Sequence, residues 1–173
     1  MTKYRDVYLE REKTLADTGT YTIELAVVDP ISVIEVVFSA TNSETGNKKN
    51  PIARNVRKIE VIDGAKVIYA LDGRLAKALA LAMSNKFPYY VIDETANAKQ
   101  VDSFPLYFGR WLNDNEYALV PQKFKNLQLR VTWDLNTVRP AGEHGFKPGT
   151  CKLSVMCRLI EEPAEEPNFI SHM

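Results

Sequence analysis

The chain has 173 residues, 45% of them apolar and 25% charged, and its 22 lysines and arginines balance its 22 aspartates and glutamates. This composition excludes a disordered or fibrous protein, and the length is that of one domain with its own core. Because the net charge is zero, no long-range field draws the chain to nucleic acid or to an anionic membrane, and we expect no specific nucleic-acid partner.

The distribution of apolar residues and cysteines indicates a reducing compartment. No apolar run approaches the roughly 20 residues of a membrane-spanning helix, and the N-terminus is too charged for a secretory signal peptide. The two cysteines, Cys151 and Cys157, lie six residues apart in one predicted strand, about 20 Å from each other along it. They cannot form a disulfide with one another. We therefore expect a protein that is made and kept in the cytoplasm.

The first fifty residues predict an N-terminal arm followed by two strands. Residues 1–20 are polar and lack sustained periodicity, and we interpret them as the arm. Residues 21–28 alternate as in a half-buried strand, which Pro30 ends. The β-branched run 31–41 predicts a second strand, and the polar residues 42–51 predict a surface loop.

An Asp-Gly pair at 63–64 separates two apolar runs, 56–62 and 66–71, which is the strongest local signal for a β-hairpin. Both central residues of a type I′ turn need positive φ, and we place the turn at the Asp-Gly pair. In that register Lys66 falls beside Val61 on the apolar side. The alternative is that the pair joins strands of different sheets.

One short helix is predicted, over about residues 74–86, because alanines supply helix propensity and apolar residues recur at three- and four-residue spacing. Asp72 is placed to cap its N-terminus and Asn85 to end it. The apolar residues at this spacing are Leu75, Leu79, Ala82 and Met83.

The second half of the chain predicts several short strands and two longer ones. The short strands are expected near 89–93, 104–108 and 117–120. Residues 127–135 alternate strictly between apolar and polar side chains, which indicates a strand with one dry and one wet face. A loop rich in Gly and Pro then leads to a last strand over 151–160.

Many short strands, turn signals between them and one helix favour an all-β fold, an antiparallel β-sandwich of the jelly-roll type. We divide the chain into an N-terminal arm over 1–20, a jelly-roll domain over 21–162 and an acidic, Pro-containing tail or linker over 163–173. The two inner faces of such a sandwich form the core. The predicted core residues are Ile23, Leu25, Ile59, Leu129, Val131, Trp133 and Val155.

Patterns typical of catalysis, cofactor binding or metal binding are missing from the sequence. The two histidines, His144 in a Gly- and Pro-rich loop and His172 in the tail, do not form a metal-binding cluster with carboxylates. Cys157, between Met156 and Arg158, is predicted to be a small buried hydrophobe and not a nucleophile. The glycines do not group into a phosphate-binding loop. We therefore predict no catalytic residue, no cofactor, no metal and no enzymatic activity.

Residues 104–135 are the most informative part of the chain, because they place strand-like runs on either side of a polar bend at 113–115. This stretch resembles the coat subunits of the double-jelly-roll virus lineage, in which a Pro-aromatic-Gly-Arg stretch precedes a polar bend and a long alternating strand. Ahead of this stretch, the IEVIDG residues at 59–64 and then a short helix near Asp72-Gly73 follow the order of the first roll of those major capsid proteins. The matching residues are Pro105, Phe108, Gly109 and Arg110, the bend, and 127–135.

The resemblance implies an eight-stranded roll that stands upright on a viral shell and is repeated in the same chain, with three chains in each capsomer. Only one roll fits here, so the chain is expected to be the first half of a longer subunit, a complete single-roll subunit or a minor shell protein. The implied partners are copies of itself as a homotrimer, and other capsid or internal-membrane proteins.

The implied location is the virion, for example of a bacteriophage, after assembly in the host cytoplasm. In this reading the arm becomes ordered when it reaches a neighbouring subunit, or the membrane or scaffold beneath the shell.

Tyr107, Arg110 and Trp111 are the candidate residues of a subunit interface, since buried aromatic residues and arginine dominate such contacts. The alternative function is a carbohydrate-binding or adhesive β-sandwich module. Such a module would be monomeric and would present a flat aromatic patch, for which Tyr89 and Tyr90 are available beside Tyr107 and Trp111.

Overall fold

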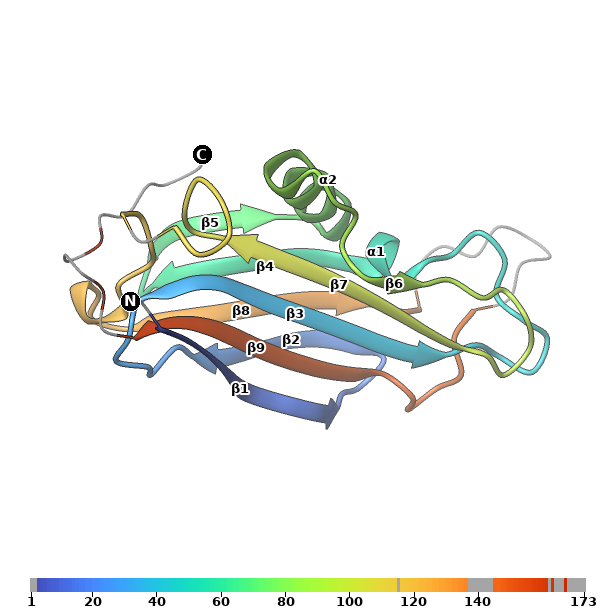
Figure 1. Cartoon of the computed structure of the whole chain (residues 1–173). Helices are drawn as coiled ribbons and strands as arrows, with labels where there is room; N and C mark the ends of the chain where they lie inside the picture. The colour runs from blue at the N-terminus through green and yellow to red at the C-terminus, as the bar shows by residue number, and fades with distance from the viewer. Residues whose placement is uncertain (1–2, 115, 137–144, 162, 164–166, 168–173) are drawn as a thin grey trace.

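Antiparallel pairing between strands that are distant in the sequence builds a five-stranded sheet (Figure 1). The structure is a computed structural model, and it describes residues 3–114, 116–136, 145–161, 163 and 167. The strand order in this sheet is β1-β9-β3-β7-β6. The bounds are Lys3–Thr14 for β1, Ile31–Thr41 for β3, Tyr90–Val91 for β6, Lys99–Tyr107 for β7 and Lys152–Glu161 for β9.

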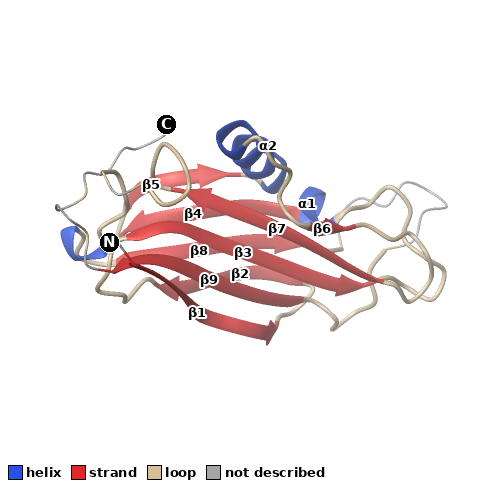
Figure 2. Ribbon diagram, in the orientation of Figure 1, coloured by secondary structure: helices blue, strands red, loops and turns tan. Residues whose placement is uncertain are grey.

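A four-stranded sheet packs against the first, in the order β2-β8-β4-β5 (Figure 2). Without the short β6, the two sheets have the strand order of an eight-stranded jelly roll. The predicted all-β jelly-roll sandwich is therefore confirmed. The bounds are Thr18–Glu24 for β2, Val56–Asp63 for β4, Lys66–Leu71 for β5 and Leu127–Asp134 for β8, with helices α1 at Ile52–Asn55, α2 at Gly73–Ser84 and the 3-10 turn η1 at Pro121–Lys123.

The core lies between the inner faces of the two sheets, and each of the predicted core residues is buried in it. β8 alternates strictly between buried and half-buried residues, as its sequence predicts. Phe38 of β3 has its ring centroid 6.3 Å from that of Phe104 in the same sheet and 6.0 Å from that of Trp133 in the facing sheet. The Trp133 Nε1 donates to the backbone oxygen of Ala16 over 2.8 Å. Aromatic contacts thus join the two sheets.

The predicted hairpin is confirmed, with a different turn. β4 and β5 are antiparallel neighbours, and a register shift between Val61 and Ile62 absorbs the mismatch in the apolar pattern. Gly64 and Ala65 form the two-residue turn, and of the two only Gly64 has positive φ, at 58°. This excludes type I′ and is typical of type II′, which has glycine at its first central position. The predicted turn was therefore misplaced by one residue.

The N-terminal segment is a strand, so its prediction as an arm is wrong. Residues 3–14 form β1, which pairs with β9 from one end to the other, and β2 begins at Thr18 instead of residue 21. The segment lacks strong apolar alternation because β1 lies at the edge of its sheet and most of its residues are exposed. Its backbone hydrogen-bonds to β9 of the same chain.

Predictions for the second half are confirmed in part. β7 is longer than the predicted strand 104–108. Residues 117–120 contribute isolated bridges in place of a strand, among them the bridge between Leu119 and Ile31. The last strand is confirmed as β9. The predicted loop residue His144 and most of the predicted tail, with His172, lie outside the described residues.

Helix α2 forms where the sequence predicts, but it buries an unexpected face. The Asp72 carboxylate accepts hydrogen bonds from the backbone N of Arg74 at 2.8 Å and of Leu75 at 2.9 Å. Asn85 ends the helix with a left-handed φ of 53°. The buried residues of α2 are Gly73, Ala76 and Ala80. The fully buried side of α2 thus carries small residues, while Leu79 packs only partly against the core and Leu75 is 55% exposed.

Candidate subunit interface

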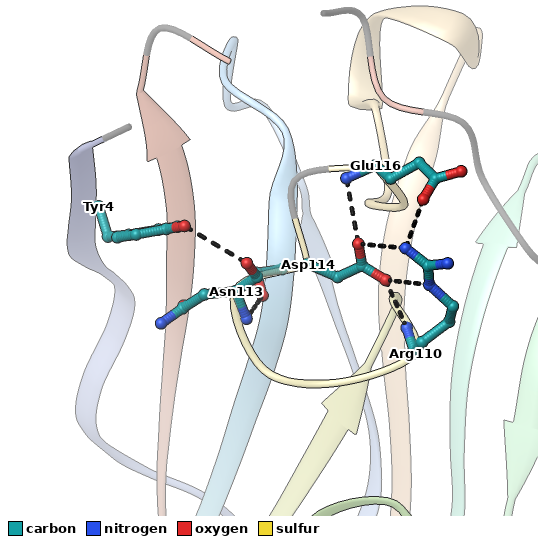
Figure 3. Close-up of polar contacts among 6 residues, drawn as sticks. Tyr4, Arg110, Asn113, Asp114 and Glu116 are labelled. Carbon is teal, nitrogen blue, oxygen red and sulfur yellow. Dashed lines mark hydrogen bonds and ion pairs between the residues drawn. The ribbon is translucent and has the colours of Figure 1, made fainter. Parts of the chain in front are cut away.

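The polar bend after β7 is organised around the carboxylate of Asp114 (Figure 3). Asp114 is only 2% exposed, and it accepts hydrogen bonds from the backbone N of Arg110 at 3.0 Å and of Glu116 at 3.1 Å. The Arg110 guanidinium adds Nε at 2.9 Å and Nη2 at 3.2 Å. Backbone and charged donors therefore fix the bend from within.

The charge of Asp114 is stabilised inside the bend. Burial alone would raise the pKa of this carboxyl, but hydrogen bonds from Arg110 and from backbone N–H groups outweigh burial and lower the pKa to about 2. Glu116 is a second partner of Arg110, with Oε2 2.5 Å from Nη2. A Cβ on Gly109 would lie 2.7 Å from the Cβ of Asp114 and from the backbone oxygen of Tyr117. The bend therefore requires both the glycine and the arginine of the Gly-Arg pair.

Arg110 and Trp111 form one stacked unit. The Arg110 guanidinium carbon lies 4.3 Å from the ring centroid of Trp111 and 4.6 Å from that of Tyr117, which is a cation–π arrangement with both rings. Trp111 is 54% exposed, yet the stack connects it to the carboxylate of Asp114. Of the three residues predicted for an interface, Arg110 thus orients Trp111.

A largely apolar hollow of about 350 Å³ opens beside Trp111. Tyr107 and Trp111 line it together, and Arg110 lies outside its lining. Sequence reasoning missed Phe87 and Leu112, which line the same hollow and are 72% and 41% exposed. The one sequence signal for Phe87 is an aromatic residue before a proline, just past a helix end. The remaining lining residues are Met83, Ser84, Lys86, Pro88 and Pro105.

The hollow adjoins the outer face of the five-stranded sheet. The register aligns Tyr8 of β1, Met156 of β9, Glu35 of β3 and Pro105 of β7 in one row on that face. A second hollow, of about 380 Å³, includes the first three of these residues together with Tyr89. We name six aromatic and apolar side chains of the two hollows the aromatic surface. Five of them are exposed and Tyr107 is half-buried: Tyr8, Phe87, Tyr89, Tyr107, Trp111 and Leu112.

The bend is tied to the strands that carry this surface. The hydroxyl of Tyr4, in β1, donates to the backbone oxygen of Asn113 over 3.3 Å (Figure 3). The backbone N of Asn113 donates to Oγ of Ser32, in β3, over 2.9 Å. β1 thus contributes both Tyr8 and a support for the bend, and it does so because it is a strand of the sheet.

Reactive groups lie away from this surface. Cys151 and Cys157 are free thiols in the core, and burial raises the pKa of each to about 12, so neither is a thiolate at neutral pH. In the described part of the chain, no three His, Cys, Asp or Glu side chains gather as metal ligands. Within the same residues, no helix has the length and apolar character to cross a membrane.

Neither a protein-family model nor a curated protein matches this chain, but solved structures match its fold. A chain of the PBCV-1 virus capsid is similar with a TM-score of 0.65 and 14% identity, over 92% of this chain and 42% of that one. The major capsid protein of Sulfolobus Turreted Icosahedral Virus is similar with a TM-score of 0.63 and 13% identity, over 94% and 49% of the two chains. For the major capsid protein of bacteriophage PM2, the TM-score is 0.57 and the identity 10%, over 92% and 51%.

These matches show that the chain has the fold of viral major capsid proteins, as the resemblance of residues 104–135 predicts. At 10–14% identity the likeness concerns the fold. The chain spans about half the length of the structures that it matches, 42–51%.

Proposed function

We propose that this protein is a viral structural protein, a major capsid subunit or the first jelly roll of one. It assembles through the aromatic surface into trimeric capsomers of an icosahedral shell. The observation that carries the proposal is the jelly roll shared with three viral capsid structures over 92–94% of the chain. The protein acts in the virion, after assembly in the host cytoplasm, and catalyses no reaction.

The aromatic surface has the composition of a protein–protein interface. Aromatic residues and arginine are enriched in such interfaces, and large exposed apolar patches on monomers mark contact sites. Trp111 and Phe87 are 54% and 72% exposed, so most of their apolar area is available for burial by a partner. Because the stack with Arg110 holds Trp111 in one orientation, contact with a second subunit costs little side-chain entropy.

The length of the chain supports one roll of a two-roll subunit, since the matched structures are about twice as long. In this proposal β1 to β9 form the first roll, and residues 163–173 begin the tether to a second one. Other capsid or internal-membrane proteins then contact the assembled shell. A complete single-roll subunit would use the same aromatic surface between copies.

The first test is the solution mass of the purified chain, measured by light scattering over a range of concentrations. We expect a defined trimer that Trp111→Ala weakens by roughly 2 kcal/mol per contact, about 30-fold in affinity, because truncating a central aromatic removes most of its binding energy. Val28→Ala is the control, since Val28 is 71% exposed and outside the aromatic surface. The proposal would be contradicted if the wild type were a monomer at every concentration, or if Trp111→Ala left the affinity of trimer formation unchanged.

The carbohydrate-binding alternative predicts a monomer that binds glycans through Tyr89 and Trp111. The comparisons do not favour it, because the matched structures are virus capsid proteins. A monomeric chain that binds glycans, and whose glycan binding is abolished by Trp111→Ala, would support this alternative and reject the capsid proposal.

A further inference from the structure

The outer face of the five-stranded sheet carries a carboxylate at its centre, that of Glu35. β3 is the middle strand of this sheet, and Glu35 lies there between Met156 of β9 and Pro105 of β7 in the register. The side chain is half-buried. Because an ionised group in a partly covered position loses water that a partner must replace, the presence of Glu35 needs a physical explanation.

Glu35 is unpaired within its own chain. In the part of the chain that the structure describes, its carboxylate takes part in no hydrogen bond or ion pair. The hydrogen bond to Asp6, and also the charge of Glu35, raises the pKa of Arg158. The Arg158 guanidinium, however, donates through Nε and Nη2 to the Asp6 carboxylate over 2.7 and 2.8 Å. This cation is therefore already engaged with another carboxylate.

The outer face of the other sheet treats its central carboxylate differently. Glu60 of β4 lies 2.9 Å from Nε of Arg130 and 2.7 Å from Nζ of Lys58. Two cations thus compensate for the burial of Glu60, whereas none of the described residues does so for Glu35. The two carboxylates differ in what their own chain supplies to them.

Glu35 lies in a hollow whose other side chains favour a cation. The hollow of about 380 Å³ is lined by Glu35 together with Tyr8 of β1 and Tyr89, just before β6. The two tyrosines are 56% and 63% exposed, and the faces of such rings attract ammonium and guanidinium groups. The guanidinium carbon of Arg11 already lies 5.6 Å from the ring centroid of Tyr8. A carboxylate and two tyrosines in one hollow therefore suit a basic side chain.

Assembly through the aromatic surface would remove this hollow from water. Tyr8 and Tyr89 belong to that surface, and Glu35 lines the same hollow. A neutral or acidic covering surface would leave the Glu35 carboxylate buried and uncompensated, which is strongly unfavourable. The surface that covers the hollow must therefore bring a positive charge.

We propose that a lysine or arginine side chain of a neighbouring subunit, a second copy of this chain, enters the hollow and pairs with Glu35. The inference rests on the proposed function, and it names the chemistry that the neighbouring subunit presents to the aromatic surface. The occupant is a second copy because copies of the chain cover this surface in the proposed capsomer. Glu35 then fixes the register of the contact, since a charged pair is favourable only when its two groups meet.

The variant Glu35→Gln tests the pairing, because it removes the charge and keeps the shape of the side chain. In light scattering at low salt, we expect trimer formation to weaken by about 30-fold per contact. Added salt should weaken the wild-type trimer more steeply than the trimer of the variant. Glu44→Gln is the matched control, since the side chain of Glu44 is 80% exposed and lines neither hollow. This control should leave the affinity unchanged.

The sign of the effect separates the possible roles of Glu35. If the carboxylate were buried at the interface without a cation, Glu35→Gln would strengthen the trimer, because a costly unpaired charge would be gone. If Glu35 lay outside the interface, the affinity would not change. Either result would overturn the inference and leave the capsid proposal standing, whereas a wild-type monomer at every concentration would reject both.

The stability of the monomer shows whether the partner belongs to the same chain. Thermal unfolding is measured at a dilution at which the wild type is monomeric. We expect Glu35→Gln and the wild type to unfold at the same temperature, because Glu35 has no ion-pair partner among the described residues. If the variant unfolded at a lower temperature and Glu44→Gln did not, a cation of the same chain, such as Arg158, would be the partner. That result would reject the pairing between subunits.

Discussion

The outer faces of the two sheets differ in chemistry, although their inner faces share one core. On the four-stranded sheet, an outward row runs from Thr22 through Arg130 to Glu60, and Arg130 Nε lies 2.9 Å from Oε2 of Glu60. On the five-stranded sheet, an outward row contains Tyr8 and Met156. The first face carries paired charges, whereas the second carries exposed aromatic area beside its own ion pair between Asp6 and Arg158.

This difference is not required for folding. A sandwich needs two dry inner faces, and both sheets supply them, as shown by Val131 at 0% and Val155 at 0% exposure. Outward side chains contribute less to stability, so they are free to serve another purpose. The aromatic outer face is therefore the part of the molecule that we propose for assembly.

The largest expected difference in stability is between variants of the two tryptophans. Trp133 is 3% exposed in the core and Trp111 is 54% exposed on the aromatic surface. We expect Trp133→Ala to lower the free energy of unfolding by about 4 kcal/mol, because it leaves a cavity between the sheets. Trp111→Ala should change the same quantity by about 0.5 kcal/mol or less. Urea unfolding followed by circular dichroism measures both, and similar losses would erase the distinction between core and surface.

A smaller effect is expected at the bend that supports the aromatic surface. Asp114 has a folded-state pKa of about 2, below its ordinary 3.8, so its carboxylate stabilises the fold above pH 4 and this contribution is lost as the pH falls toward 2. Asp114→Asn should therefore cost about 2 kcal/mol at pH 7. The difference between the variant and the wild type should shrink steadily in urea titrations between pH 4 and pH 2.

Glu44→Gln is the control for this pH dependence, because the side chain of Glu44 is 80% exposed and its replacement should have little effect at any pH. If the stability difference between Asp114→Asn and the wild type stayed constant down to pH 2, the charge of Asp114 would not be what stabilises the bend. Since Asp114 fixes Arg110, and Arg110 stacks on Trp111, the variant should also weaken the proposed trimer at neutral pH.

The fold was predictable for strands in which the alternation of apolar and polar residues follows the burial of the two faces. β8 alternates because one of its faces is in the core and the other is solvated, and the Asp-Gly pair marked the hairpin between β4 and β5. β1 gave no such signal, because it is an edge strand and most of its residues are exposed. Its residue Asp6 accepts hydrogen bonds from Arg158, 152 positions further on, and sequence periodicity carries no information about such pairs.

The candidate site was predictable to a similar extent. Aromatic residues beside a polar bend indicated Tyr107 and Trp111. The positioning role of Arg110 was not predictable, because it depends on the burial of Asp114, which is a tertiary property. Phe87 joins the surface only because α2 ends next to β7 and the bend. The face of α2 was not predictable from its leucines, since the close approach at Gly73 decided it.

The smallest expected effect on stability concerns Glu60, on the polar outer face of the four-stranded sheet. Burial alone would raise the pKa of Glu60, but Arg130 and Lys58 lower it, and these partners are 38% and 51% exposed. Solvent screens such pairs, so Glu60→Gln should cost about 1 kcal/mol in urea unfolding. Its light-scattering mass should equal that of the wild type, because no residue of this cluster belongs to the aromatic surface. If Glu60→Gln dissociated the trimer, the polar sheet would also be an interface, and exposed aromatic area would no longer identify the contact surface.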